Sequence, residues 1–499
     1  MKKIVAFLCS FIFALVCFSG CASKVNVNPS QKYYSDSNQE YMIYAYHSPV
    51  PAFETLNGVD QRTVEGYKQH LDGGFNVLLI QANDPYDGNF ETSQLKKNLD
   101  NAKLAGYDKV IITDMRLHSL SSRTDAIIGQ GKTYATFDDL VKKVKSWTDE
   151  YRYYQDGMVI GVQLVDEPAY NVLPQLGQVY KAIKKVWPEC FIQANLLPLD
   201  TSAASGRYAP PSFSGSSEAA YEQYLTDFCR YSGATNITMD SYPIRMKLGT
   251  NGYEDATYSI TSAHMRCLQI MQKVAKEYGC TIGTVANACE FKDSSGTVKL
   301  KGPNEDEMYW QNNVYMGYGS KSFSYYTYCS KPDNLHTDGS SFIDRNGNTT
   351  EMYTYMTRIH KEMQDFAPVI MNFDYNTFGY YYNRGTVEFG VSYLTSDPND
   401  ENYINFAVLK DVAVEDNDAA FVTELIDSKN NQYMYMLMNP QHPSNSKYTD
   451  LDLHAVMSFA SSYTKLEVWT EGQMKIVDLA GGKATFDLKA GHAVFVMPY

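Results

Sequence analysis

Residues 158 to 168, MVIGVQLVDEP, join a strand-like apolar run to two adjacent carboxylates, Asp166 and Glu167, and a proline. The run is rich in β-branched residues and does not alternate strictly, which is typical of a strand buried on both faces of a parallel sheet. Asp, Glu and Pro are also residues that begin helices. The place of this strand in the whole chain decides between a helix start and a functional site.

Seven further segments of strand length share this pattern. They are YMIYAYHSP (41–49), FNVLLIQAND (75–84), DKVIITDMRLH (108–118), CFIQANLLP (190–198), NITMDSYP (236–243), TIGTVANACE (281–290) and KSFSYYTY (321–328). Around them, apolar residues recur three and four positions apart, as on one face of an amphipathic helix. These helical segments are residues 95–106, 137–151, 173–187, 219–233, 262–279, 305–319 and 350–366.

Eight strands alternating with helices over about 330 residues predict an α/β fold, a closed (β/α)8 TIM barrel. We place this barrel at residues 41–370. An open doubly wound sheet is the alternative, but its glycine-rich phosphate loop is missing after the first strand. Beyond the barrel, short alternating strands and turn signals such as AGGK predict an all-β sandwich at residues 380–499.

The N-terminus has the layout of a secretory signal at residues 1–20, with two lysines, an apolar run and then small residues. The tetrapeptide FSGC (18–21) resembles the lipobox of bacterial lipoproteins, which implies cleavage before Cys21 and lipidation of its thiol. Residues 21–40 are then expected to form a lipidated polar tether. The chain is predicted to be extracytoplasmic and lipid-anchored to a bacterial cell membrane or outer membrane. An ordinary signal peptide or an uncleaved anchor is the alternative.

The amino-acid composition limits the classes of partner that the protein can bind. A formal net charge of −14 argues against nucleic acid, since no basic stripe is present to neutralise phosphates. The 41 tyrosines suit stacking on apolar ring faces and hydrogen bonding to hydroxyls, although core packing explains most of them. The cysteines beyond Cys21 show no C-x-x-C pair, so we expect buried structural thiols, no metal site and no cofactor.

Polar residues gather where the predicted strands end. In a β/α barrel the functional groups lie at the carboxyl ends of the strands, so these residues are expected to form one ring. Each of them also has a capping or turn-forming explanation. The residues expected to bind substrate are His47, Asn83, Asp114, Arg116, Asp166, Asn195, Asp240, Tyr242, Asn287 and Tyr326.

This layout resembles the β/α-barrel glycoside hydrolases, in particular the large retaining clan A, over about residues 41–370. The resemblance implies an acid/base at Glu167 on the fourth strand and a nucleophile at Glu290 near the end of the seventh. That clan usually has Asn before the acid/base, where this sequence has Asp166. An Asp-Glu pair there resembles the hexosaminidase-type enzymes, in which the acetamido group of the substrate attacks and the Asp orients it. We expect the retaining mechanism with Glu290 as nucleophile, and the substrate-assisted mechanism is the alternative.

Both mechanisms require a protonated Glu167, and its neighbour Asp166 together with burial is expected to raise its pKa. A retaining pair of carboxyls stands about 5 to 5.5 Å apart and an inverting pair about 6.5 to 9.5 Å. Asp240 and Glu307 are the reserve candidates, although Glu307 also fits a helix start. A noncatalytic glycan-binding lipoprotein and an unrelated barrel enzyme remain alternatives, because fold does not fix function.

Overall fold

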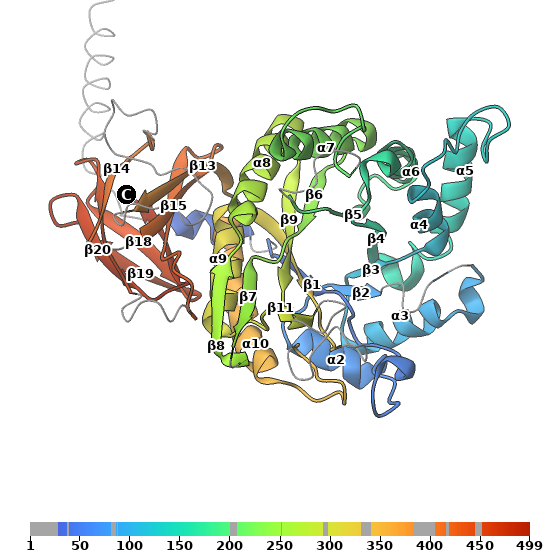
Figure 1. Ribbon diagram of the computed structural model, residues 1–499, viewed down its shortest axis with the longest axis horizontal. Coiled ribbons are helices and arrows are strands. Elements are labelled where there is room, and N and C mark those ends of the chain that lie inside the picture. Colours follow the sequence, from blue (N-terminus) through green and yellow to red (C-terminus); the bar gives the residue numbers. More distant parts are fainter. Residues whose placement is uncertain are drawn as a thin grey trace, which may run out of the picture.

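The computed structural model describes residues 28–36, 39–80, 86, 88–199, 207–250, 252–292, 298–330, 341–382, 405–415, 419–444 and 452–499. Eight parallel strands form the central sheet of the first domain (Figure 1). Their order is β1-β12-β9-β6-β5-β4-β3-β2, and the N–H of Val77 donates to the carbonyl of Ile43 at 3.1 Å to join the two ends. The predicted TIM barrel is confirmed. The strands are β1 (Met42–Ala45), β2 (Leu78–Ile80), β3 (Val110–Ile112), β4 (Val159–Asp166), β5 (Phe191–Leu196), β6 (Asn236–Asp240), β9 (Thr281–Asn287) and β12 (Ser320–Tyr326).

The helices surround this barrel. Each of the seven helical segments expected from the sequence is helical, and α2 and α4 are additional. Serine caps and left-handed glycines fix several ends: Ser93 accepts from Lys96 N–H at the start of α3, and Gly106 ends it with φ +106°. Among the described helices none is both long and apolar enough to cross a membrane. The helices are α2 (Val64–Asp72), α3 (Gln94–Ala105), α4 (Met115–Ser121), α5 (Phe137–Thr148), α6 (Leu173–Val186), α7 (Ser217–Ser232), α8 (Ser262–Tyr278), α9 (Glu305–Gly317) and α10 (Glu351–Ile370).

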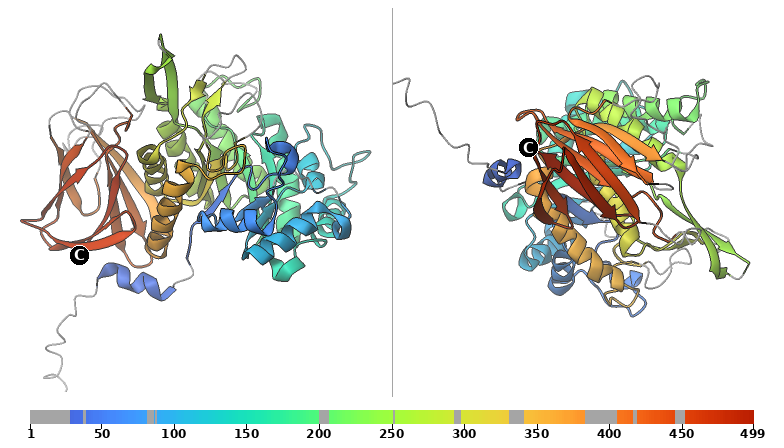
Figure 2. Two further views of the ribbon diagram at one scale, coloured as in Figure 1. Left: turned by 90° about the horizontal axis from the view of Figure 1, so that it is seen from below. Right: turned by 90° about the vertical axis from the view of Figure 1, so that its left-hand side faces the viewer.

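A small antiparallel sheet is inserted into the barrel after β6 and β9. Its order is β10-β11-β7-β8, and the β7–β8 hairpin projects from the body of the protein (Figure 2). The sequence analysis did not foresee this sheet, although the dipeptide Asn251-Gly252 in the sequence is a hairpin signal. The strands are β7 (Ile244–Gly249), β8 (Gly252–Ile260), β10 (Phe291–Lys292) and β11 (Val298–Leu300).

The C-terminal domain is a β-sandwich of two antiparallel sheets, in the orders β13-β15-β16-β21-β18-β19 and β14-β17-β20. A second apolar core, which includes Val412, Leu437, Val468 and Phe486, fills the space between them. β13 begins at Asp374, before residue 380, where the sandwich was expected to start. The strands are β13 (Asp374–Tyr382), β14 (Leu409–Val414), β15 (Ala419–Asp427), β16 (Gln432–Met438), β17 (Leu453–Phe459), β18 (Lys465–Thr470), β19 (Gln473–Asp478), β20 (Lys483–Leu488) and β21 (Ala493–Pro498).

The expectation of a polar tether through residue 40 is wrong for Pro29–Asp36, which form a 3-10 helix docked on the sandwich. The backbone N–H of Ser30 donates to Glu467 Oε2 at 3.1 Å, and the Tyr33 hydroxyl donates to Asp427 Oδ2 at 2.6 Å. Glu467 is fully buried, so it needs such donors. The segment therefore belongs to the folded domain. Cys21 and residues 1–20 lie outside the described residues.

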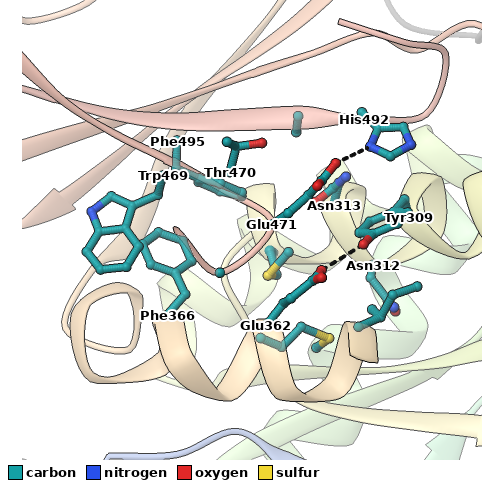
Figure 3. A pocket seen from close by; sticks show the side chains of 15 residues that line it. Tyr309, Asn312, Asn313, Glu362, Phe366, Trp469, Thr470, Glu471, His492 and Phe495 are labelled. Atoms are coloured by element: carbon teal, nitrogen blue, oxygen red, sulfur yellow. Dashed lines mark hydrogen bonds and ion pairs between the residues drawn. The ribbon is translucent and has the colours of Figure 1, made fainter. Parts of the chain in front are cut away.

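The two domains meet through α9 and α10 on the barrel side. Figure 3 shows Trp469 beside Phe366, with ring centroids 5.0 Å apart, and the Tyr309 hydroxyl donating to Glu362 at 2.7 Å. A Cβ on Gly317 would lie 2.4 Å from Met436 Cε, so α9 approaches the sandwich as closely as a glycine permits. The helix is buried on nearly all sides, which explains why its apolar pattern is not one-sided.

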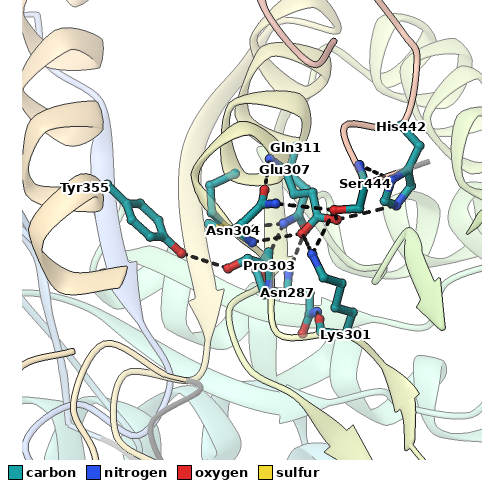
Figure 4. A network of polar contacts seen from close by, with 10 residues as sticks. Asn287, Lys301, Pro303, Asn304, Glu307, Gln311, Tyr355, His442 and Ser444 are labelled. Carbon is teal, nitrogen blue, oxygen red and sulfur yellow. Dashed lines mark hydrogen bonds and ion pairs between the residues drawn. The ribbon is translucent and has the colours of Figure 1, made fainter. Parts of the chain in front are cut away.

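A buried charge network crosses the same junction. Glu307, fully buried, accepts from Lys301 Nζ at 2.5 Å, from Ser444 Oγ of the sandwich at 2.8 Å and from the N–H of Asn304 at 2.9 Å (Figure 4). Burial lowers the pKa of His442, whose Nε2 lies 3.7 Å from Glu307 Oε1. Glu307 occupies position N3 of a capping box, so the helix-start interpretation of this residue holds.

We expect Glu307→Ala to destabilise the protein by about 3 kcal/mol, because it leaves the charge of Lys301 in a buried site without its carboxylate. The matched control is Glu305→Ala two residues earlier, where the pair with Arg358 is half exposed and should contribute less than about 1 kcal/mol. Urea denaturation of both variants measures the difference. Equal losses would show that the network does not hold the junction.

Candidate functional site

The Asp166-Glu167 pair lies at the carboxyl end of β4 and does not cap a helix. The helix that follows, α6, has Val172 as its N-cap, and the preceding 3-10 turn has Ala169. Glu167 has a left-handed backbone with φ +43°, and its N–H donates to the carbonyl of Asn195 at 2.7 Å. A left-handed conformation is costly for a glutamate and is found where neighbouring structure enforces it, often at functional sites.

The side chain of Asn195 bridges two carboxylates. Its Nδ2 donates to Asp166 Oδ1 at 2.8 Å and to Asp240 Oδ2 at 3.0 Å, which uses both amide hydrogens. Asn195 is fully buried at the end of β5, between β4 and β6 in the sheet. The parallel register therefore brings carboxyls from alternate strands to one place. Asn195, expected to bind substrate, instead holds the acidic groups in position.

Burial and like charge act together on these acids. Burial first, and then the charge of Asp166, raise the pKa of Glu167, while Arg207 at 3.9 Å opposes the rise. Burial, Asp166 and Glu167 raise the pKa of Asp240 well above its ordinary value, against hydrogen bonds from Tyr242 and Asn195. Glu167 keeps 42% of its side chain exposed. The cluster thus combines an accessible carboxyl of raised pKa with two neighbouring carboxyls.

Tyrosines lie beside these acidic residues. The Tyr46 hydroxyl accepts a hydrogen bond from Gln193 Nε2 at 2.9 Å. Burial, and next the charge of Asp166, raise the pKa of Tyr46 well above its usual value. The rings of Tyr242 and Tyr326 lie 5.9 Å apart and tilted by 30°. His47, with φ +47°, contacts the edge of Tyr326 at 5.7 Å. These predicted residues do gather at the strand ends.

Two other predicted residues turn away from the strand ends. Asp114 is fully buried, caps α4 and is held by Arg116, whose Nη2 lies 2.8 Å from Asp114 Oδ2. Arg116 also pairs with Glu150 at 3.0 Å and stacks over Tyr86. A helix cap and a buried ion pair account for the polar atoms of both residues, and their expected contact with substrate stays a prediction.

The polar atoms of Asn287 also have partners within the protein, and its expected contact with substrate stays a prediction. Asn287 is fully buried, its Nδ2 donates to the carbonyl of Lys301 at 2.8 Å, and Gln311 hydrogen-bonds both its N–H and its carbonyl. Glu290 follows three residues beyond the end of β9 and is 9% exposed. The charges that act on the pKa of Glu167 include Asp166, which raises it, and Arg207, which lowers it.

Asn83, expected to bind substrate, lies outside the described residues. The sequence analysis did not foresee that Arg207 lies near Glu167. Arg207 belongs to the long connection between β5 and α7, and its carbonyl accepts from the N–H of Tyr170 at 2.9 Å. The sequence around a basic residue in a long loop does not show which distant residue it contacts. The one available signal was general: long loops at the mouth of a barrel tend to carry function.

The fold and the site together define a β/α-barrel protein with an acidic site at the carboxyl ends of its strands. No protein-family model matches the chain, and no curated protein matches it in sequence. Solved structures with similar folds include an α-amylase from Geobacillus thermoleovorans complexed with acarbose, at 11% identity and a TM-score of 0.47 over 92% of this chain and 98% of that one.

Two more are a family 27 β-L-arabinopyranosidase from Geobacillus stearothermophilus and a family 44 xyloglucanase from Paenibacillus polymyxa. The first has 10% identity and a TM-score of 0.44 over 94% of this chain and 98% of that one. The second has 10% identity and a TM-score of 0.41 over 92% and 97%. At these values the likeness carries no argument, so the fold rests on the strand order and the site on its own geometry.

We expect Asp240→Asn to change the pH dependence of stability. A carboxyl whose pKa is higher in the folded state than its ordinary 3.8 stabilises the fold fully below that value and loses this contribution as pH rises toward the folded pKa. The variant should therefore gain stability relative to the parent between about pH 4 and about pH 7. Urea unfolding at both pH values measures it, with exposed Asp478→Asn as control. A pH-independent difference would contradict the raised pKa.

Proposed function

We propose that this protein is a glycoside hydrolase that acts on oligo- or polysaccharides, with Glu167 as the proton donor. The observation that carries the proposal is Glu167 itself: a half-exposed carboxyl at the end of β4, in a left-handed conformation, with a pKa raised by burial and by Asp166. A raised pKa favours the protonated form of the carboxyl, and this form can give its proton to a leaving oxygen.

The surroundings suit a neutral sugar. Asp166, Glu167 and Asp240 make the site acidic, and Tyr242 and Tyr326 supply ring faces and hydroxyls of the kind that pack against sugars. The proposed substrate is a carbohydrate met outside the cytoplasm, where the N-terminal segment is expected to anchor the chain through lipidated Cys21. No cofactor is invoked, because general acid catalysis and a carboxylate or an acetamido nucleophile supply the chemistry.

For the nucleophile we favour the acetamido group of the substrate. Asp166 is held by Asn195 beside Glu167, where its carboxylate can accept a hydrogen bond from an acetamido N–H. The acetamido oxygen would then attack the anomeric carbon while Glu167 protonates the leaving oxygen.

Glu290 is the second candidate nucleophile. Its support is its position just beyond β9, the seventh strand of the barrel, and its burial at that edge. Double displacement through Glu290 would place a covalent glycosyl bond on its carboxylate, which Glu167 would then help to hydrolyse by activating water.

We expect Glu167→Gln to reduce turnover of glycosides with poor leaving groups by at least about 100-fold and that of activated aryl glycosides much less, because only poor leaving groups need a proton. Steady-state kinetics on a panel of both kinds, including 2-acetamido sugars, measures the effect. Glu189→Gln, an exposed change between α6 and β5, is the control.

Equal losses on both kinds of substrate would remove Glu167 from the acid role. Glycan binding with no turnover by the parent protein would instead favour the noncatalytic alternative. In that case Glu167→Ala and Glu290→Ala would leave binding intact.

A separate experiment identifies the nucleophile. If the acetamido group attacks, only 2-acetamido sugars turn over, a thiazoline analogue inhibits, and Asp166→Ala lowers kcat more than Glu290→Ala does. If Glu290 attacks, a 2-fluoro glycoside leaves a covalent adduct on it, and azide rescues Glu290→Ala with inverted product. Mass spectrometry of the treated protein decides, because an adduct on Glu290 would overturn the mechanism that we favour.

A further inference from the structure

Two cysteines from neighbouring β/α units lie side by side on the outside of the barrel. Cys229 is in the last turn of α7, and Cys280 lies directly after Gly279, which ends α8 in a left-handed conformation. Their Sγ atoms are 3.9 Å apart and both thiols are free. A disulfide requires about 2.05 Å between the sulfurs, so a side-chain adjustment of about 2 Å separates the pair from a bond.

The backbone around the pair is well fixed. Cys280 N–H donates to the carbonyl of Ala275 at 2.9 Å, and the next residue, Thr281, donates to the carbonyl of Thr235 at 3.0 Å. The thiol of Cys280 points at the carbonyl of Ala234, 3.0 Å away. These contacts hold Cys280 against the end of α7, so the short distance follows from packing of the two helix ends.

The two thiols differ in access and in acidity. Cys280 is partly exposed, whereas Cys229 is 2% exposed beneath it. The S–H of Cys229 stabilises the thiolate of Cys280 and lowers the pKa of Cys280. A soluble oxidant therefore meets Cys280 first, and Cys229 is the thiol placed to react with whatever forms there.

We propose that Cys229 and Cys280 form an intramolecular disulfide when the protein meets a low-molecular-weight disulfide. The sequence analysis treated all cysteines as structural thiols, and this pair departs from that expectation. Disulfides persist outside the cytosol, where the N-terminal segment is expected to direct the chain. The inference does not depend on the proposed glycosidase activity.

The chemistry is two thiol–disulfide exchanges. The Cys280 thiolate attacks one sulfur of oxidised glutathione, the glutathione S–S bond breaks, and one glutathione thiolate leaves with the proton that Cys280 lost. The Cys229 sulfur then attacks Cys280 Sγ and expels the second glutathione thiolate, which takes the Cys229 proton. The protein loses two thiol hydrogens and one oxidised glutathione becomes two reduced molecules.

The bond would close a loop that runs from Cys229 to Cys280 and contains β6, the β7–β8 hairpin and α8. Asp240 and Tyr242 of the site lie within this loop. Because closing a long loop restricts the unfolded chain more than the folded one, the bond should stabilise this unit of the barrel without touching the strand ends.

The experiment treats the full chain with oxidised glutathione, alkylates the remaining thiols and maps peptides without reduction. We expect a Cys229–Cys280 cross-linked peptide, its loss on adding dithiothreitol, and a thermal midpoint roughly 5 to 10 °C higher in the oxidised protein. Cys229→Ser should keep glutathione as a stable adduct on Cys280. Cys190→Ser, at a fully buried thiol, is the control and should form the bond like the parent.

Two outcomes would overturn the proposal. One is separate alkylation of Cys229 and Cys280 after oxidation of the parent protein. The other is a parent protein that retains glutathione on Cys280, which would show that Cys229 does not reach it. The Cys229→Ser and Cys280→Ser variants are compared with the parent under reducing conditions, so that any change in folding is separated from the loss of the bond.

Discussion

One side-chain amide organises the candidate site. Asn195 donates both hydrogens of its Nδ2, one to Asp166 at 2.8 Å and one to Asp240 at 3.0 Å. Its backbone carbonyl accepts a hydrogen bond from the N–H of Glu167. Acidic groups so close repel one another and would move apart toward water unless donors held them. Because the amide is neutral, it holds them without cancelling their charge, and the pKa of Glu167 and that of Asp240 stay raised.

The barrel holds these side chains at a low cost in conformational entropy. Asp166 pairs with Asn195 in the register of β4 and β5, and Asp240 ends the adjacent strand β6, so three neighbouring strands deliver three side chains with no long loop to order. The left-handed turn at Glu167 then directs its side chain out of the strand, where 42% of it remains accessible. The rigid strands fix the positions of the polar side chains, and the turn at Glu167 leaves its carboxyl accessible to solvent.

The strands and most helices were predictable because their signals are local: continuous apolar runs, spacing of three and four, serine caps and glycine stops. The site was predictable only in part. Asp114 follows β3 and Asn287 ends β9, much as Asp166 ends β4. Arg116 and Lys301 nevertheless occupy their polar atoms, and those partners depend on tertiary packing. Arg207 and the docking of Ser30 on Glu467 are contacts between distant parts of the chain, for which neither sequence segment carries a pattern.

A chain of hydrogen bonds connects the domain junction to β9, the seventh strand of the barrel. Ser444 of the sandwich donates to Glu307, Glu307 holds Lys301, and the carbonyl of Lys301 receives the side chain of Asn287 at the end of β9. Asn287 Oδ1 in turn accepts from Cys289 N–H at 3.4 Å, which shapes the turn toward Glu290. The sandwich therefore helps to fix the backbone from which Glu290 projects. If Glu290 acts in the chemistry, the barrel depends on its C-terminal domain for more than stability.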